Sequence, residues 1–336
     1  MPGPVLLAAI IAAAGLIACL GTRGLIPLLH RAAVLDHPNE RSSHATPTPR
    51  GGGIALVAAI LFAWLALIVT GAIPPRLLVV LFGAALLAAI SWVDDLRGLS
   101  PAMRLLTQFG AVGLGTIALM PAGPVFQGWL PAGLDALGAG LLWLWFINLF
   151  NFMDGIDGLA GSEAAAIAIG LVLFAGVGAG SDPGLAALAV TIVAAALGFL
   201  VWNWAPARIF LGDVGSVPLG YLLAFLLLDV AARGRWKIAL ILPLYFLADA
   251  TLTLVRRLAR REPVWQAHRQ HFYQRAVQRG LGHAAVVRRV IAADLVLIAC
   301  GWAAENGWGI AALAGAAAVV LALLAGLALG WRRGAV

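Results

Sequence analysis

Charged side chains are scarce in this sequence. Only 11% of its 336 residues are Asp, Glu, Lys or Arg, and 62% are hydrophobic, whereas a soluble domain carries about 25% charged residues and about half apolar ones. This shortage excludes an ordinary soluble domain. Because about 20 apolar residues in a helix cross the hydrocarbon core with every backbone group paired, and many segments qualify, the composition predicts an integral membrane protein.

Cysteine is also nearly absent. Cys19 and Cys300 lie in separate apolar runs far apart in the chain, which excludes a disulfide framework and a thiolate metal site, so both are interpreted as small hydrophobic residues. The N-terminal segment lacks a basic stretch, and its apolar run is too long for a cleaved signal peptide. We therefore expect it to remain as the first membrane span.

The net charge of +7 raises the question of nucleic acid. The Lys and Arg residues, however, lie in short links between apolar runs rather than on one basic face, so we expect no nucleic-acid partner. Most are interpreted as topology determinants beside anionic membrane lipid. A minority remain candidates for binding phosphate.

The apolar runs predict an all-α fold, a polytopic integral membrane protein with one domain over residues 1–336 and about eleven transmembrane helices. Pairs such as Pro74-Pro75 mark tight links between the spans. The spans are expected near residues 4–22, 54–72, 77–93, 104–120, 135–152, 162–180, 185–202, 215–231, 237–256, 289–304 and 308–331.

The basic residues are divided unequally between the two membrane faces. An odd number of spans puts the termini on opposite sides, and an external N-terminus places 18 of the 22 Lys and Arg residues on the inner side. Because cytoplasmic loops carry the excess of Lys and Arg, we predict a periplasmic N-terminus and a cytoplasmic C-terminus. The cytoplasmic loops are then residues 23–53, 94–103, 153–161, 203–214 and 257–288.

Most of the chemically versatile side chains fall on the same inner side. All six histidines lie there, together with Asp94, Asp95, Asp154, Asp157 and Asp213. A transporter places polar groups near the bilayer midplane, and we find no repeat symmetry of that kind. The pattern favours an enzyme with its active site at the cytoplasmic face, with a transporter or a non-catalytic assembly protein as the alternatives.

Asp94 and Asp95 end the third predicted span. Two adjacent carboxylates at a helix C-terminus repel each other and oppose the helix macrodipole, so a cation or another compensating partner is expected beside them. The alternative is a solvated helix end with Arg97 as the partner.

Amide and carboxylate side chains recur at every third residue in the segment INLFNFMDGIDGLAG. Asn148, Asn151, Asp154 and Asp157 run along one helical stripe or through a helix end broken by glycine. We interpret them as one wall of a ligand site, with an ordinary polar loop as the alternative.

Asp213 lies between two glycines, in FLGDVGS. Carboxylate and amide oxygens suit a hard cation such as Mg²⁺, which keeps waters and binds substrate phosphates, so Asp213 is a candidate ligand. Its alternative role is the N-cap of the eighth span, because Asp is among the best capping residues.

The longest inner loop, 257–288, is expected to contain an amphipathic helix with His268, His271 and Arg275 on one face. Arginine forks and imidazole N–H groups suit phosphate oxygens. A zinc site is only weakly supported, because a third ligand is missing nearby, and an interfacial helix on anionic lipid is the main alternative.

Two more positions are candidates for binding a ligand. In the first inner loop, Arg50 adds anion-binding capacity together with Arg41 and His44. Asp249 lies in the ninth predicted span, about two turns before Arg256, and an ionisable group at that depth is a functional candidate. A structural pair with Arg256 or its neighbour is the alternative.

Taken in order, these motifs resemble those of a known family. DHPNERSSHATPTPRGGG, VDD, NLFNFMDGIDGLAG, FLGDVGS and AHRQHFYQR lie on alternate loops between about residue 36 and residue 280, and they are similar to motifs of the polyprenyl-phosphate N-acetylhexosamine-1-phosphate transferases, glycosyltransferase family 4. This superfamily includes MraY-type and WecA-type enzymes. The last motif is most similar to the WbpL-like branch, which initiates lipopolysaccharide O-antigen chains. It departs from the consecutive histidines of the MraY-type branch, and the aspartate pair lacks the further acidic residue of some WecA-like members.

The resemblance implies a transferase of the bacterial inner membrane that uses Mg²⁺, with Mn²⁺ as a substitute. The reaction would move an N-acetylated hexosamine-1-phosphate from a UDP-sugar to undecaprenyl phosphate and release UMP, in O-antigen or related cell-envelope glycan synthesis. Transfer from UDP-MurNAc-pentapeptide is the alternative, and a homodimer is left open. Asp94 and Asp95 are implied as the catalytic pair, and Asn151 and Asp213 as the Mg²⁺ ligands. The resemblance also implies Asp154, Asp157, His268 and His271 as substrate-binding residues. Arg50, Asp249 and Arg275 are added as substrate-binding candidates because of their charge and position.

Overall fold

The computed structural model describes residues 2–36, 46–176, 181–263 and 268–329. Within these ranges the chain is almost entirely helical, apart from one short antiparallel pair, β1 (Leu35–Asp36) and β2 (Thr48–Pro49). The α-helices are α1 (Pro4–Arg31), α2 (Gly53–Val69), α3 (Leu78–Arg97), α4 (Pro101–Leu119), α5 (Ala132–Phe152), α6 (Leu159–Ala175), α7 (Pro183–Asn203), α8 (Asp213–Val230), α9 (Trp236–Ile241), α10 (Leu244–Ala259), α11 (Phe272–Gln278), α12 (His283–Glu305) and α13 (Gly309–Leu329). Short helical turns are η1 (Pro75–Leu77), η2 (Met120–Ala122) and η3 (Ala231–Arg235).

Most of these helices are long apolar segments. In the described part of the chain, seven helices are long and apolar enough to cross a membrane, and α2 and α6 are shorter apolar helices. A helix satisfies every backbone N–H and C=O internally, which apolar segments require where no water is present. The prediction of an all-α, polytopic membrane protein is confirmed, and the count of eleven spans stays a prediction.

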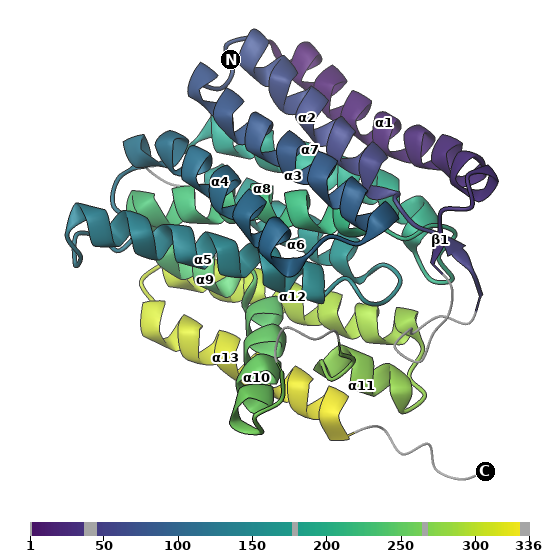
Figure 1. Ribbon diagram of the computed structural model, residues 1–336. Helices are drawn as coiled ribbons and strands as arrows, with labels where there is room; N and C mark the ends of the chain where they lie inside the picture. The colour runs from purple at the N-terminus through teal and green to yellow at the C-terminus, as the bar shows by residue number, and fades with distance from the viewer. Residues whose placement is uncertain (1, 37–45, 177–180, 264–267, 330–336) are drawn as a thin grey trace.

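Helix α8 forms the centre of the bundle. It packs against α2, α3, α4, α5 and α6, and it lies in the middle of the molecule in Figure 1. Every residue from Val214 to Val230 is buried, as expected for a helix that is apolar all round. Trp143 of α5 stacks on Tyr221 of α8, with ring centroids 4.9 Å apart. Because α8 begins at Asp213, this packing also holds that carboxylate in place.

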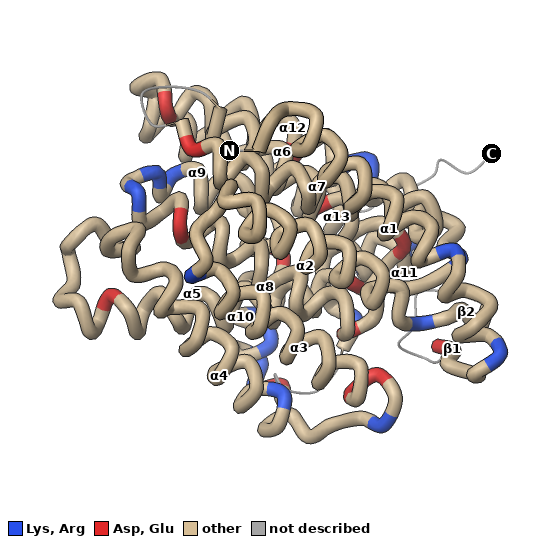
Figure 2. Tube along the Cα trace, turned by 90° about the horizontal axis from the view of Figure 1, so that it is seen from above, with Lys and Arg blue, Asp and Glu red and all other residues tan. Residues whose placement is uncertain are grey.

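The connections between helices collect at two ends of the bundle. At one end, Arg233 after α8 pairs with Asp182 before α7, at 3.2 Å. At the other end, the backbone of Arg50 forms an isolated parallel β-bridge with Phe210, which precedes α8. Helix α1 ends at this second end, beside β2, and α13 packs against α11 there. Each of these two helices therefore runs from one end of the bundle to the other. Figure 2 shows charged residues mostly near helix ends and in connections, with long uncharged stretches between them.

The ninth predicted span, residues 237–256, is wrong as a single helix. The structure divides it into α9, which ends at Ile241, and α10, which begins at Leu244. Pro243 at the division lacks a backbone N–H, and its ring obstructs the preceding helical turn. Helix α10 then runs steeply across the direction of its neighbours (Figure 1). This turn carries Asp249 into the protein interior, where it is fully buried.

Candidate active site

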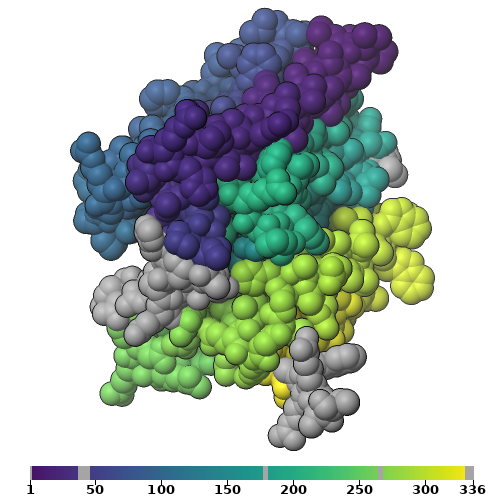
Figure 3. Space-filling model, turned by 90° about the vertical axis from the view of Figure 1, so that its right-hand side faces the viewer, coloured from purple at the N-terminus to yellow at the C-terminus, as the bar shows by residue number. Residues whose placement is uncertain are grey.

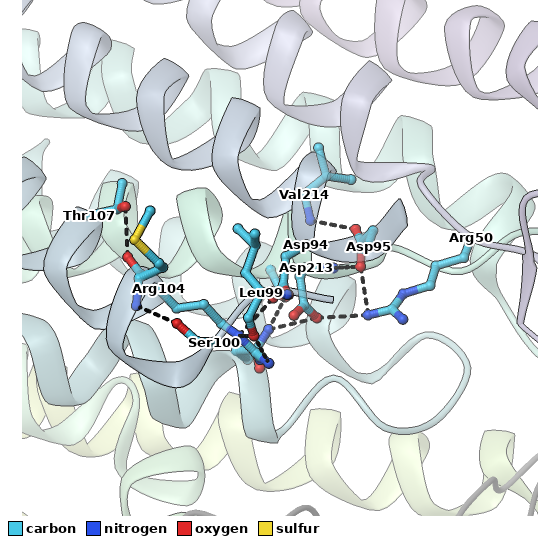
Figure 4. A network of polar contacts seen from close by, with 12 residues as sticks. Arg50, Asp94, Asp95, Leu99, Ser100, Arg104, Thr107, Asp213 and Val214 are labelled. Atoms are coloured by element: carbon cyan, nitrogen blue, oxygen red, sulfur yellow. Dashed lines mark hydrogen bonds and ion pairs between the residues drawn. The ribbon is translucent and has the colours of Figure 1, made fainter. Parts of the chain in front are cut away.

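The two aspartates at the end of α3 have separate partners (Figure 4). Asp94 accepts a hydrogen bond from a backbone N–H of the α3–α4 turn and pairs with Arg104 on α4, whose Nε is 3.0 Å from Oδ2. Asp95 pairs with Arg50, whose Nη2 is 2.6 Å from Oδ1. Compensating partners are therefore present, as expected. Among the described residues they are Arg104 and Arg50, which corrects the alternative that named Arg97.

The Asp95 carboxylate also caps the N-terminus of α8. It accepts hydrogen bonds from the backbone N–H groups of Asp213 and Val214, at 3.2 and 2.9 Å. Exposed N–H groups and the macrodipole favour an anion at a helix N-terminus. The N-cap residue of α8 is Gly212. The alternative role of Asp213 as the N-cap is therefore wrong, because Asp213 is the first residue of the helix itself.

Arg50 lies between Asp95 and Asp213. Its Nη2 is also 3.0 Å from Asp213 Oδ1. Burial by itself lowers the pKa of Arg50, but the Asp213 and Asp95 carboxylates raise it overall, so the guanidinium stays charged. The side chain is 35% exposed, which leaves part of it accessible to a ligand. Arg41 and His44, the other anion-binding candidates of this loop, lie outside the described residues.

The three glycines after Arg50 allow the connection between α1 and α2 to pack against the start of α8. Backbone N–H groups of residues 51–53 donate to the carbonyl groups of Phe210 and Leu211, at 2.9 to 3.2 Å. A Cβ on Gly53 would lie 2.2 Å from the Cα of Gly215. Only glycine permits such a close approach of two backbones, and this contact places Arg50 beside the carboxylates.

Asn151 brings the last turn of α5 to the start of α8. Its Nδ2 donates to Asp213 Oδ1 at 3.1 Å and to Ser216 Oγ at 2.9 Å. The two residues that the resemblance named as metal ligands are therefore in direct contact. Ser216 was not predicted; it lies one turn after Asp213 on the same helix, and that spacing was the available signal.

Asp154 and Asp157 lie in the turn between α5 and α6, so the helix end broken by glycine is the arrangement that forms. Asp157 ties this turn to two other segments, since its Oδ2 accepts from the Ala207 N–H at 3.0 Å and lies 3.2 Å from His283 Nδ1 on α12. Burial raises the pKa of Asp154 well above its usual range, and the Asp213 carboxylate adds to the shift. The Asp154 carboxyl group is therefore suited to hold a proton beside the site.

Asp249 organises the start of α11. Its Oδ1 accepts a hydrogen bond from the Phe272 N–H at 2.9 Å and lies 3.2 Å from His271 Nδ1, and its Oδ2 accepts from the Tyr273 N–H at 3.2 Å. The residue has no exposed surface. Its carboxylate therefore holds the loop and the His271 ring in place, and its assignment to substrate binding stays a prediction.

The helix expected in loop 257–288 is shorter than predicted. Residues 264–267 lie outside the described part, and α11 begins only after His271, which is its N-cap. His268, His271 and Arg275 consequently do not share one helical face. The two imidazole rings stack instead, with centroids 4.9 Å apart. Partial burial and neighbouring arginines lower the pKa of Arg275, and such a concentration of positive charge favours an anion.

We expect the His268 side chain to make the protein less stable at acid pH. Burial, together with His271 and Arg257, lowers the pKa of His268 from 6.5 to about 4. A base with a depressed pKa contributes stability above its unfolded value, and this contribution is lost as the pH falls toward the folded value. Thermal unfolding of the wild type and of His268→Gln, from neutral pH to about pH 4, measures the effect. An acid sensitivity that is identical in the two proteins would contradict the depressed pKa.

The oxygens of Asp213 and Asn151 fit a hard cation. Among the described residues, no group of three His, Cys, Asp or Glu side chains could hold a metal ion, and Mg²⁺ does not require one. It is commonly held by one or two carboxylates, with waters and substrate phosphates completing the octahedron. Within the described residues, no group donates a hydrogen bond to Asn151 Oδ1 or Asp213 Oδ2. These two atoms are the ones that would hold Mg²⁺.

A pocket of about 60 Å³ lies between α3, α4, α5 and α8, beside Asp94 and Asp213. Arg104 and Gln108 of α4 also line it, although neither was predicted. They are four residues apart and therefore share one face of the helix, which was the available signal. The remaining lining residues are Leu87, Ile90, Ser91, Thr107, Asn148, Asn151, Phe152 and Val217.

Fold and site together define a class of protein. It is a membrane-embedded helical bundle whose carboxylates, amides and arginines meet at one end, around a pocket suited to phosphate and a hard cation. Figure 3 looks onto this end, where the purple N-terminal part of the chain lies above the light-green part that contains α11 and the start of α12.

Comparisons with known proteins identify the family. The model of glycosyl transferase family 4 matches residues 77–231. A probable undecaprenyl-phosphate N-acetylglucosaminyl 1-phosphate transferase of Bacillus subtilis is 29% identical over 77% of this chain and 75% of its own length. A decaprenyl-phosphate N-acetylglucosaminephosphotransferase of Mycobacterium tuberculosis is 29% identical, over 82% of this chain and 76% of its own. A phospho-N-acetylmuramoyl-pentapeptide-transferase of Streptococcus suis is 31% identical, over 71% and 78%.

The chain belongs to glycosyl transferase family 4. The resemblance to MraY-type and WecA-type enzymes that the motifs indicated is confirmed.

Proposed function

We propose that this protein transfers an N-acetylated hexosamine-1-phosphate from a UDP-sugar to undecaprenyl phosphate at the cytoplasmic face of a bacterial inner membrane. The observation that supports the proposal most directly is the contact between Asp95, Arg50, Asp213 and Asn151, which joins three helices and one inner loop at a single point. The relatives act on polyprenyl phosphates and N-acetylated sugars according to their names. Such a transfer requires two anionic phosphates to approach each other. The arginines and the candidate Mg²⁺ ligands of the site are the groups that would neutralise their charge.

The reaction forms one bond and breaks another. An oxygen of undecaprenyl phosphate attacks the phosphorus that carries the sugar, and the bond from this phosphorus to the oxygen of UMP breaks. Mg²⁺ on Asp213 and Asn151 would neutralise phosphate charge. Arg50 and Arg104 place fixed positive charge beside the phosphates, where it stabilises charge that develops in the transition state. Asp94, beside the small pocket, is placed to accept a proton from the acceptor phosphate or to orient it.

The prenyl chain of the acceptor needs an apolar surface. A cavity of about 370 Å³ lies between α5, α8, α9 and α10, and it is lined almost entirely by apolar side chains such as Leu142, Phe146 and Leu247. It contains none of the predicted site residues. We assign the phosphates to the polar end of the bundle. We assign the lipid tail to an apolar surface such as the one that lines this cavity.

For the sugar, we favour a UDP-N-acetylated hexosamine, including 6-deoxy forms, in O-antigen initiation. The His268-to-Arg275 motif is most similar to that branch, and α11 covers only Phe272–Gln278, a short element for enclosing a peptide-bearing donor. Transfer from UDP-MurNAc-pentapeptide is the second candidate, because the Streptococcus suis relative that is 31% identical carries that activity in its name.

Release of UMP tests the proposal. Purified protein is incubated with undecaprenyl phosphate and Mg²⁺ or Mn²⁺, in parallel with UDP-GlcNAc, UDP-N-acetylfucosamine, UDP-N-acetylquinovosamine and UDP-MurNAc-pentapeptide. We expect turnover with one of the first three and a loss of turnover with a chelator. Preference for the muramyl donor would overturn the choice of sugar and leave the transferase chemistry intact. No UMP release with any donor would overturn the proposed function.

We also propose that the active-site end of the bundle faces the cytoplasm, because that side carries most of the Lys and Arg residues. A reporter fused after Gly128, in the connection between α4 and α5, should read as periplasmic. One fused after Arg279, at the end of α11, should read as cytoplasmic. The same readout from both fusions would contradict this orientation.

A further inference from the structure

Two carboxyl groups meet inside the bundle at a distance from the candidate active site. Glu163 lies in the second turn of α6 and Asp294 lies near the middle of α12. Their exposed fractions are 0% and 4%, and the two side chains are within hydrogen-bonding reach of each other. The proposed transfer reaction uses neither of them.

Neither carboxyl group has a donor from the rest of the described chain. All four oxygens are buried without a hydrogen-bond partner, and no Lys, Arg or His among the described residues forms an ion pair with either group. The titratable group that faces the pair from another element is Tyr245 of α10. Its hydroxyl donates to Asp249 Oδ2 at 3.3 Å, so it is engaged elsewhere.

Two ionised carboxylates are unstable side by side at a buried position that has no opposite charge. Desolvation and mutual repulsion both disfavour the ionised form of a buried carboxyl group, and two carboxylates that share a site retain a proton between them. An ionisable group within a membrane helix that lacks an opposite charge is a functional candidate by default. A carboxylic acid, by contrast, can donate its proton to the neighbouring carboxyl oxygen and satisfy both groups.

The pair lies on the same helix–helix contact that supports the DGIDG turn. Helices α6 and α12 pack along their length, and Gly301 of α12 faces Phe174 near the far end of α6. At the near end, Asp157 before α6 contacts His283 at the start of α12. Glu163 and Asp294 lie between these two points. A change in their separation would therefore be transmitted to the turn that carries Asp154.

We propose that a proton joins Glu163 and Asp294, and that this hydrogen bond positions α6 against α12 and thereby holds the Asp154–Asp157 turn in place for the nucleotide donor. The two are positioning residues, since neither reaches the pocket beside Asp94. The role in binding the nucleotide donor rests on the proposed function, whereas the existence of the shared proton does not.

Infrared difference spectroscopy of the full chain in lipid nanodiscs tests the proton directly. The wild type should show the carbonyl stretch of a protonated carboxyl group that is absent from the double variant Glu163→Gln/Asp294→Asn. Identical spectra would mean that both groups are ionised, for instance around a bound cation, and would overturn the proposal. This measurement requires no turnover, so it can succeed or fail independently of the transferase assignment.

Thermal unfolding and donor KM against pH test the positioning role. The shared proton is bound in the folded protein and absent from the unfolded chain above about pH 5, so the wild type should lose stability as the pH rises from there toward the pH at which the pair releases its proton. Above that pH the protonated fraction falls about tenfold per pH unit, and the donor KM should rise by up to the same factor, with kcat much less affected. Glu163→Gln keeps a donor at this position and should show neither change. Glu163→Ala, which leaves Asp294 without a partner, should raise KM at every pH. Asp229→Asn, at the outer end of α8, is the control and should keep the wild-type profile. An alkaline rise of KM that persists in Glu163→Gln would overturn the positioning role.

Discussion

Asp213→Asn is expected to lower turnover by about a thousandfold and to leave the protein folded, since loss of one electrostatic contact to a transition state typically costs 10² to 10³. The amide has the shape of the carboxylate but lacks its charge, and the site beside Asn151 would then offer Mg²⁺ two neutral oxygens and no carboxylate. Folding should survive because the N-terminus of α8 is capped by Asp95 and not by Asp213. Arg50 also retains Asp95 as a partner, at 2.6 Å.

UMP release and thermal unfolding, measured on the same preparation, check this prediction. Asp229→Asn is a matched control, because Asp229 lies on the same helix and is also paired with an arginine, Arg233, at 2.7 Å. That variant removes a comparable charge at the opposite end and should retain turnover. If Asp213→Asn turned over at close to the wild-type rate at ordinary Mg²⁺ concentrations, Asp213 would have no part in the site.

Asp95→Ala is expected to destabilise the protein by about 1–3 kcal/mol, the usual cost of leaving a buried hydrogen-bond donor without its partner, and to abolish activity. The Asp95 side chain has no exposed surface. Its removal leaves two N–H groups at the start of α8 without an acceptor and removes the closer of the two carboxylates that hold Arg50. Because α8 is the centre of the bundle, the loss affects folding as well as catalysis.

The neighbouring aspartate provides the comparison for that prediction. Asp94→Ala should also reduce turnover but should cost less stability, because Asp94 accepts one backbone N–H group whereas Asp95 accepts two at the start of α8. Asp95→Asn should lie between wild type and Asp95→Ala, since the amide oxygen still accepts one hydrogen bond. Equal loss of stability in Asp94→Ala and Asp95→Ala, measured by thermal unfolding, would show that Asp95 does not have the capping role assigned to it.

Much of the fold was predictable because hydrophobicity and charge act along short stretches of chain. The predicted spans 54–72 and 185–202 correspond to α2 (Gly53–Val69) and α7 (Pro183–Asn203) within a few residues. Other spans differ more: α1 continues to Arg31, nine residues past its predicted end, and residues 237–256 contain Pro243, which divides α9 from α10. Hydropathy does not register that division, because a proline in an apolar run barely changes the average.

The proximity of some candidate residues was predictable from the sequence, and the arrangement of others was not. Asn151 and Asp213 were paired by resemblance, and the structure brings them to 3.1 Å. His268, His271 and Arg275 were assigned to one helical face, whereas α11 begins after His271. The start of α11 depends on the buried carboxylate of Asp249, which lies on a different helix, α10. This carboxylate accepts hydrogen bonds from the first two N–H groups of α11. No pattern within residues 268–275 contains that information.

The sequence by itself determined that this chain is a membrane helical bundle with its chemistry at one end, because those properties follow from local composition and from the sign of the charges beside each span. Only the tertiary structure decided which groups act together. Asp95 caps a helix that begins 118 residues later, Asp157 meets His283, and Glu163 meets Asp294. Such contacts depend on which helices become neighbours and on how each is rotated, and these are set by packing of the whole bundle around α8 rather than by any one segment.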